Sequence, residues 1–298
     1  MARTQRDSKV TLCHDIWNGS HTHLIIVAWD AYACVNFYAE IQKKITDALK
    51  RLLGLSHLII WEGDPMVCEL GDLERAKERI VYLYENPSQD NLVESIDKFP
   101  GYSSWREFLK CKGQLAGTST EMHPWIRLPS IPELSSPMPS PREDDNVVRL
   151  LRHRNKAKHQ LVRKPNDWMR CFGVTKDEDA EKINTEIIAM LREREDKHAN
   201  DRKKDNRTVM GVAKLTSQPI LADHTPKKND RRIYINTSVN EIRMKRIREH
   251  RHFSEECRRC YEAWKRGDFT VVWPEGAFKP PLPPNFNYLP DGPPRFGP

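Results

Sequence analysis

The hydrophobic positions in the first 53 residues predict a β-hairpin followed by a helix. Two apolar runs, residues 10–17 and 21–29, are separated by Asn18-Gly19, a dipeptide typical of a tight turn. From residue 33 to residue 53, apolar side chains recur every three or four positions, as they do along one face of an α-helix. Gly54 follows directly and suits the end of that helix.

The hydrophobic pattern up to residue 110 adds two short strands and two helices. Residues 57–61 and 66–70 are short apolar runs, which are typical of strands. A helical stripe then runs from Asp72, which suits the N-cap, to Pro87, which suits the end of a helix. Residues 102–109 predict one further short helix. The order β-β-α-β-β-α indicates an α+β fold with an antiparallel sheet over residues 1–110.

The remainder of the chain has a different character. Residues 111–148 contain many prolines and serines without a hydrophobic period, which predicts a linker. Residues 149–265 predict a mainly helical accessory region, with an apolar stripe at 183–191 and one long helix at 240–265. Residues 266–298 form a Pro-rich tail that favours an extended conformation.

Positive charge is concentrated behind the predicted sheet domain. The chain carries a net charge of +7; residues 1–110 contribute −3, whereas residues 149–265 contribute +12. A basic region beside a nearly neutral domain favours binding of phosphate backbones, while a set of solvated helices with mixed charges accounts for the same numbers about equally well.

Composition excludes several classes of protein. Charged residues make up 31% of the chain, the mean hydropathy is −0.73, and no apolar run is long enough for a membrane span. The N-terminal residues lack an apolar signal segment, and the seven cysteines show no framework spacing. We therefore expect a cytoplasmic protein in a reducing compartment.

Four residues of the predicted sheet domain carry the candidate chemistry. His21 and His23 alternate along a strand and therefore lie on one face, where two imidazoles can hold a metal ion if a third group joins them. Tyr82 and Asn86 are four residues apart on the predicted helix and therefore share one face of it. Two histidines, a phenol and an amide oxygen suit metal-assisted attack on a phosphodiester.

The order and spacing of three motifs resemble those of the single-tyrosine HUH transposases, named for a His-hydrophobic-His strand, and in particular the REP-associated tyrosine transposases. The matching segments are His21-Thr22-His23, Tyr82-Leu83-Tyr84-Glu85-Asn86-Pro87 with Leu92-Val93, and Pro100-Gly101-Tyr102-Ser103-Ser104-Trp105. Thr22 stands where the family has a hydrophobic residue, on the face opposite the histidines. The resemblance covers residues 1–110, and the segment 261–278 resembles the C-terminal end of some larger members.

The resemblance implies an RRM-like or ferredoxin-like sheet and a specific chemistry. His21, His23 and Asn86 would bind Mg²⁺ or Mn²⁺, and Tyr82 would attack a phosphodiester of single-stranded or hairpin DNA, leaving a 5′-phosphotyrosine link. The resemblance thus implies a metal-dependent transposase that cuts and rejoins single strands of DNA. A homodimer is a further expected assembly. Family members usually place a strand and a helix before the strand that precedes the histidines. Without these a sheet edge would be exposed, unless another segment occupies that place.

Several alternatives stay open at this stage. Tyr84 is a rival nucleophile, although it lies off the face of Asn86. The chain could also be a catalytically inactive nucleic-acid-binding descendant of a transposase or, less in keeping with its motifs, a replication initiator of the wider HUH class. Candidates for contact with the DNA backbone are the following basic residues: Arg149, Arg152, Arg154, Lys156, Lys158, Arg258 and Arg259.

Other sites are less well supported by the sequence. His250, His252, Cys257 and Cys260 have spacings that occur in zinc sites, but one continuous helix would prevent them from converging on one ion. The chain has no phosphate-binding glycine loop, no Gly-x-Ser-x-Gly motif and no spacing that singles out an acidic triad.

Overall fold

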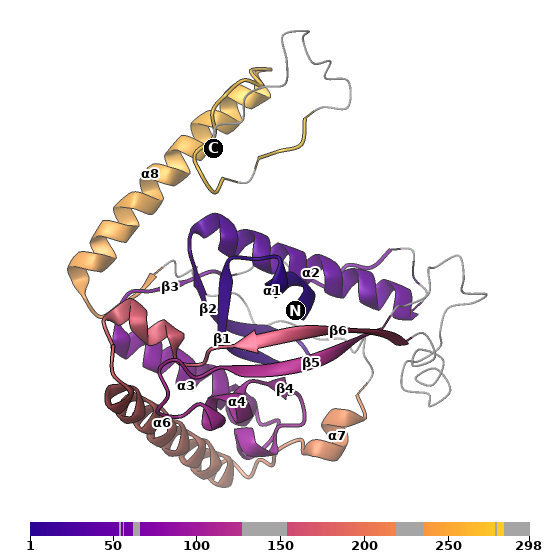
Figure 1. Ribbon diagram of the computed structural model, residues 1–298, viewed down its shortest axis with the longest axis vertical. Helices are drawn as coiled ribbons and strands as arrows, with labels where there is room; N and C mark the ends of the chain where they lie inside the picture. Colours follow the sequence, from indigo (N-terminus) through magenta and orange to yellow (C-terminus); the bar gives the residue numbers. More distant parts are fainter. Residues whose placement is uncertain are drawn as a thin grey trace. The chain divides into compact units, whose positions relative to one another are not determined.

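The computed structural model describes residues 1–53, 55, 57–61, 66–126, 154–218, 235–277 and 279–282. The chain divides into two compact units (Figure 1). The first comprises Met1–Met66 and Asp72–Arg232, and the second comprises Val67–Gly71 and Ile233–Pro298. Each unit is described separately below.

The predicted hairpin is present and forms one end of the main sheet. Strand β1 (Val10–Trp17) pairs antiparallel with β2 (Thr22–Ala28), from Val10↔Ala28 to Trp17↔Thr22. The backbone N–H of Asn18 donates to the carbonyl of His21 at 2.9 Å and closes the turn. An irregularity between Leu12 and His14 shifts the register, so that the two ends of β1 face different surroundings.

The other edge of β1 is covered by strands from later in the chain. Strand β6 (Arg154–Arg163) runs parallel to β1 with Leu12 opposite Arg163, and β5 (Ser119–Ile126) pairs antiparallel with β6. Strand β4 (Tyr102–Ser103) also pairs with β1. The strand order is β2-β1-β6-β5, with β4 off this path. A later segment therefore occupies the place beside β1, which is one of the alternatives left open by the sequence.

The α+β class is confirmed, and the sheet is mixed rather than wholly antiparallel because β6 runs parallel to β1. The sequence prediction is wrong for residues 154–163, which form a strand instead of a basic helix, and for 119–126, which form a strand instead of part of a linker. Their pairing with each other and with β1 supplies hydrogen bonds that local periodicity does not reveal.

Two helices cover one face of the sheet. Helix α2 (Ala31–Leu53) matches the predicted helix, and its Phe37 and Ile41 pack against Val10 with Leu24, Ile26 and Ala28 nearby. The short helix α1 (Ala2–Arg6) contributes Ala2 to a second cluster with Leu12 and Leu161. The run 57–61 does not form the predicted strand. Its Trp61 indole instead contacts α2, where it donates to the Gln42 carbonyl at 3.2 Å and to Thr46 Oγ1 at 3.0 Å.

Helices also cover the opposite side of the sheet (Figure 1). Helix α3 (Leu73–Gln89) begins at the predicted N-cap, where Asp72 Oδ1 accepts from the Arg75 N–H at 2.8 Å, and continues through Pro87. Helix α6 (Asp177–Lys204) packs along α3, and its predicted stripe is buried at Ile183, Ile187 and Leu191. Shorter helical segments complete this unit: η1 (Ile96–Lys98), α4 (Trp105–Lys110), η3 (Asp167–Phe172) and α7 (Val212–Thr216).

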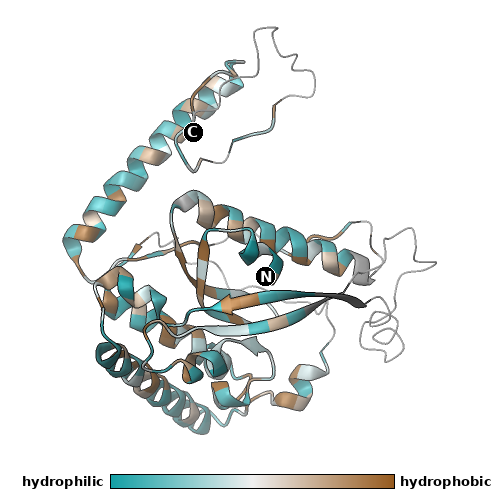
Figure 2. Ribbon diagram, in the orientation of Figure 1, coloured by the Kyte–Doolittle hydropathy of each residue, from teal (hydrophilic) through white to brown (hydrophobic). Residues whose placement is uncertain are grey.

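The second unit is built on one long helix. Helix α8 (Asn240–Lys265) has the predicted bounds and is largely hydrophilic (Figure 2). Strand β3 (Glu69–Leu70) pairs parallel with β7 (Ile235–Asn236), and Arg246 binds Glu69 at 2.8 Å. Of the strand predicted at 66–70, Glu69 and Leu70 form a strand, whereas residues 66–68 do not. None of the helices in the described ranges is long and apolar enough to cross a bilayer.

A buried ion pair joins β1 to β6. Arg163 Nε lies 2.6 Å from Asp15 Oδ1, and both side chains are fully buried. Arg163 Nη1 also binds Glu121 Oε2 of β5 at 3.0 Å, and Nη2 donates to the Tyr102 hydroxyl of β4 at 2.5 Å. Burial would lower the pKa of the Arg163 guanidinium, but Asp15 raises that pKa above its ordinary value. One guanidinium thus links four strands.

We expect Arg163→Met to lower the free energy of unfolding by about 3–5 kcal/mol, because it leaves the Asp15 carboxylate buried without a partner. Chemical denaturation followed by circular dichroism measures this change. The double variant Asp15→Asn/Arg163→Met removes the unpaired charge and should recover part of the loss. Lys98→Met, which removes an exposed pair with Glu94, is the control and should change little. Equal effects of Arg163→Met and Lys98→Met would contradict this role for Arg163.

Candidate active site

The two histidines of the hairpin lie side by side. Their ring centroids are 4.9 Å apart and the ring planes meet at 80°. His23 pairs with Ile16 in the β1–β2 register, and His21 lies at the turn just before β2. Alternation along the strand places Leu24 and Ile26 in the core beneath α2, so the histidines lie on the side that faces away from α2.

Tyr82 of α3 reaches the same place. Its ring centroid is 5.5 Å from that of His23, with an interplanar angle of 77°, and the side chain is half-buried. Arg79, one turn earlier on α3, places its guanidinium carbon 5.7 Å from the centre of the Tyr82 ring. The structure therefore brings the phenol and the two imidazoles to one side of the sheet, as the sequence predicts.

Asn86 joins this group through a residue of the hairpin turn. Its Oδ1 atom accepts a hydrogen bond from Asn18 Nδ2 at 2.5 Å, and the same Nδ2 lies 3.2 Å from His21 Nε2. An amide nitrogen can only donate, so His21 Nε2 must be the acceptor and directs its lone pair at Asn18. His21 Nε2 and Asn86 Oδ1, two of the atoms predicted to bind a metal, thus both face the Asn18 amide NH₂ group.

His23 and Asn18 each hold a buried polar atom without a partner. His23 Nε2 and Asn18 Oδ1 are both inaccessible to solvent and make no hydrogen bond in the described part of the chain. Burial, together with the charges of His21 and Arg79, lowers the pKa of His23 to about 4, so its imidazole is neutral at pH 7. A neutral ring with an unsatisfied nitrogen is a suitable metal ligand.

These donors fit a divalent cation. Two imidazole nitrogens and one or two amide oxygens form a mixed set that suits Mn²⁺ or Mg²⁺ with further positions left open. No group of three or more His, Cys, Asp or Glu side chains suited to a metal occurs among the residues that the structure describes, so a third ligand from those residues would be of another type, such as the Asn86 amide oxygen. Metal binding by His21, His23 and Asn86 stays a prediction.

Tyr84 is placed differently from Tyr82. Its side chain is fully buried, and its hydroxyl lies 2.8 Å from His14 Nδ1 and 2.9 Å from Ser104 Oγ. Burial raises the pKa of the Tyr84 phenol well above its ordinary value. Because the hydroxyl is enclosed and the phenolate is disfavoured, the geometry favours Tyr82 over Tyr84 as a nucleophile.

The candidate DNA-binding residues are divided between the two units and the residues whose side chains are not described. Arg149 and Arg152 lie outside the described residues, and Arg154 and Lys156 lie in β6, where their side chains are not described. Lys158 is exposed on β6. Arg258 and Arg259 are exposed on α8 in the second unit, where Arg259 lies 3.6 Å from Glu256.

The alternative zinc site gains no support from the geometry of α8. Cys260 is buried, and its thiol donates to the Val272 carbonyl at 3.3 Å. His252 is exposed and lies 3.8 Å from Glu256. The helix is continuous from Asn240 to Lys265, which keeps these side chains spread along it.

Sequence reasoning missed the part played by Asn18. The dipeptide Asn18-Gly19 was interpreted only as a turn signal, yet the Asn18 side chain connects the histidine strand to α3. A polar side chain three residues before His21, in a turn whose backbone bonds to His21, was the available signal. Arg79 was missed as well, although it lies at the i, i+3 spacing from Tyr82.

The pKa of His14 predicts a pH-dependent stability. Burial lowers the pKa of His14 to about 3, whereas in the unfolded chain it is about 6.5. Between these values only the unfolded state binds the proton, so stability falls as the pH drops below about 6.5, by up to about 1.4 kcal/mol per pH unit from this group. His14→Gln should show a shallower slope in denaturation experiments between pH 6 and pH 4. Equal slopes for the two proteins would contradict the assignment.

Comparison with known proteins does not identify the site. No family model, no curated protein and no solved structure matches the chain. The interpretation of the site therefore depends on the arrangement of its own side chains.

Proposed function

We propose that this chain cuts and rejoins single-stranded DNA by the chemistry of the single-tyrosine HUH transposases, with Tyr82 as nucleophile. The observation that carries the proposal is the convergence of His21, His23, Tyr82 and Asn86 from a hairpin and a helix that are sixty residues apart in the sequence. An RRM-like ancestry of the sheet is part of the same proposal, supported by the β1–β2 hairpin with α3 packed over the histidine face.

The metal-binding part of the proposal is supported by the unsatisfied His23 Nε2 and by the closeness of His21 and Asn86, which share a contact with Asn18. His21 Nε2, His23 Nε2 and Asn86 Oδ1 would hold Mg²⁺ or Mn²⁺, and the bound ion would polarise the scissile phosphate. Asn18 Nδ2 lies against both His21 Nε2 and Asn86 Oδ1, so an ion would have to displace this amide donor. The same contacts keep the two side chains close together.

The role of Tyr82 follows from its exposure and its neighbours. The half-buried phenol lies beside His23, on the side of the hairpin where a DNA strand could approach. Its oxygen would form a bond to phosphorus while the bond from phosphorus to the 3′ oxygen breaks; the phenol loses its proton and the 3′ oxygen gains one. Arg79 over the ring would stabilise the developing phenolate. Attack by a 3′-hydroxyl on the phosphotyrosine reverses the step and joins a new strand.

We expect the wild type to form a covalent adduct with a single-stranded oligonucleotide in the presence of Mn²⁺, detected as a shift on a denaturing gel. Tyr82→Phe should abolish the adduct because it removes the proposed attacking oxygen. Tyr84→Phe is the matched control and should retain the adduct. An adduct that survives Tyr82→Phe, or a wild type that forms none, would overturn the proposal; the second outcome leaves a nucleic-acid-binding protein without this activity.

Metal affinity tests the site without any DNA. Isothermal titration with Mn²⁺ should show binding that is lost in His23→Ala and weakened about 10–100-fold in Asn18→Ala, because Asn18 orients the ligands. His252→Ala, which removes an exposed histidine of α8, is the control. His23→Ala should not destabilise the fold appreciably, because it removes a buried nitrogen that has no partner. Unchanged Mn²⁺ affinity in His23→Ala would refute the assignment.

A further inference from the structure

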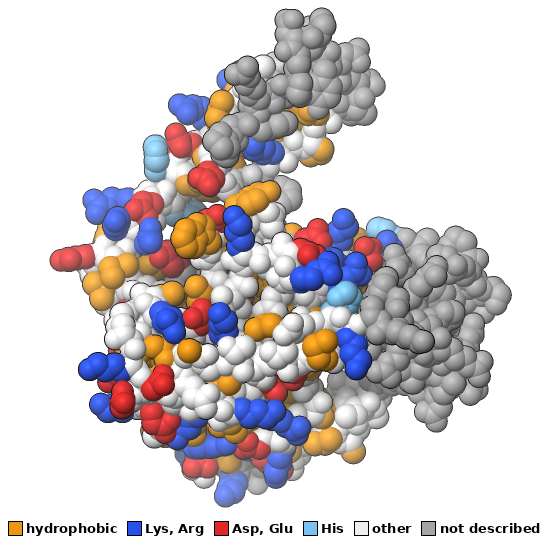
Figure 3. Space-filling model, in the orientation of Figure 1, with side chains coloured by type: hydrophobic (Ala, Val, Ile, Leu, Met, Phe, Trp, Pro, Cys, Tyr) orange, Lys and Arg blue, Asp and Glu red, His pale blue; other side chains and the backbone are white. Residues whose placement is uncertain are grey.

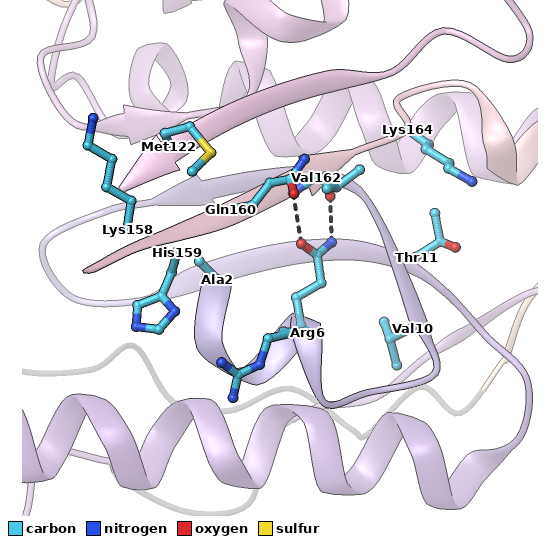
Figure 4. Close-up of a pocket in the computed structure, with 11 residues that line it drawn as sticks. Ala2, Arg6, Val10, Thr11, Met122, Lys158, His159, Gln160, Val162 and Lys164 are labelled. Carbon is cyan, nitrogen blue, oxygen red and sulfur yellow. Dashed lines mark hydrogen bonds between the residues drawn. The ribbon is translucent and has the colours of Figure 1, made fainter. Parts of the chain in front are cut away.

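A groove opens where strands β1 and β6 diverge. The two strands pair only at Leu12 and Arg163, and towards the start of β6 they separate. Helix α1 lies in this gap, where the Gln5 side chain accepts from the Val162 N–H at 2.9 Å and donates to the Val162 carbonyl (Figure 4). Gln5 thus replaces the backbone of a neighbouring strand. The remaining space is an open groove of about 670 Å³.

The groove is lined by positive charge. Arg6, Lys158, His159 and Lys164 contribute to its walls, and none of its lining residues is acidic. Arg6 is paired with Asp7 on α1, at 2.7 Å. Lys158 and Lys164 are exposed, with no carboxylate within 4.0 Å among the residues that the structure describes. Two exposed ammonium groups in a groove whose described lining holds no acidic side chain create a local positive potential that favours an anion.

The spacing of the cations indicates a polymeric anion. Lys158 and Lys164 lie six residues apart along β6 and its end, which is about 20 Å at the rise of a strand. Figure 4 shows them at opposite ends of the groove, with Arg6 between them on the α1 side. One small anion cannot contact both lysines, whereas a chain of phosphates can.

Two exposed aromatic residues follow strand β2, whose last residue pairs with the groove residue Val10. Val10 lines the groove and pairs with Ala28, so Trp29 follows one residue beyond that pair, next to the exposed Lys9. Trp29 is 87% exposed and Tyr32 is 60% exposed. On the face drawn in Figure 3, hydrophobic side chains are scattered among charged ones. An exposed indole beside Lys9 can serve as a stacking platform for a nucleic acid base.

We propose that the groove between α1, β1 and β6 binds the phosphate backbone of single-stranded DNA, with Trp29 stacking on a base at its end. This inference rests on the proposed function and places part of its substrate. The lysines supply the salt-dependent attraction, and Trp29 distinguishes a nucleic acid from other polyanions. Asp30, next to Trp29, is engaged in capping α2 through the Ala33 N–H at 2.6 Å.

Fluorescence anisotropy of the full-length chain with a labelled single-stranded oligonucleotide tests the groove. The Tyr82→Phe background keeps the measurement non-covalent. We expect Lys158→Ala/Lys164→Ala to weaken binding at least tenfold and to reduce the slope of log affinity against log salt by about 1.4, because two phosphate contacts are lost. Lys176→Ala/Lys203→Ala removes two other exposed lysines of the same unit and should bind as the background does. Equal binding by the two double variants would overturn the proposal.

Trp29→Ala tests the stacking separately. We expect about five- to a hundredfold weaker binding to the oligonucleotide, and no change in binding to heparin, which has no bases. An abasic oligonucleotide should bind the background and Trp29→Ala equally. A duplex or an RNA of the same sequence that binds more tightly than the DNA strand, or an unchanged affinity in Trp29→Ala, would refute single-stranded DNA as the occupant.

The outcome separates this inference from the proposed function. If the Tyr82 adduct forms while the groove variants bind normally, the cutting activity stands and the groove is not part of the DNA path. If the groove variants lose affinity while the wild type forms no adduct, the groove binds DNA and the proposed chemistry fails.

Discussion

The buried pair between Arg163 and Asp15 is the constraint on which the sheet depends. Asp15 belongs to the hairpin near the start of the chain, and Arg163 ends β6, 148 residues later. A charge without a partner in this position would cost more than most single contacts supply. The guanidinium also reaches Tyr102 and Glu121, so β1, β4, β5 and β6 must all be in place for it to be satisfied. Since β1 carries β2, the position of His21 and His23 follows from the same arrangement.

The hairpin serves two purposes because its two faces differ. Leu24 and Ile26 hold β2 against α2, and their burial supplies the stability of this part of the sheet. His21 and His23 face away from α2, and one of their ring nitrogens is buried without a hydrogen bond. A buried polar atom without a partner calls for an explanation, such as a bound ion or a catalytic role. The packing of Leu24 and Ile26 on the other face of β2 offsets the free energy lost by burying His23 Nε2 without a hydrogen bond.

Local patterns were sufficient for the elements near the site and insufficient for the sheet. The hairpin, α2, α3 and α8 each have a period or a turn that a short window reveals, and the structure has all four. Strands β5 and β6 were missed because their partners are distant and because basic residues in β6 imitate a solvated helix. The i, i+4 spacing places Tyr82 and Asn86 on one face of α3, but the contact of Tyr82 with His23 and the bridge made by Asn18 are tertiary contacts that this spacing does not reveal.

The parallel contact between Leu12 and Arg163 also affects how the chain folds. It closes a loop of roughly 150 residues, and contacts so distant in sequence form slowly because the entropy of the intervening chain must be lost first. The hairpin and its helices can form early from local contacts. During synthesis, however, one edge of β1 stays uncovered until residue 163 has left the ribosome. An open strand edge of this kind is prone to pairing with other chains, so the nascent protein is a candidate client of molecular chaperones.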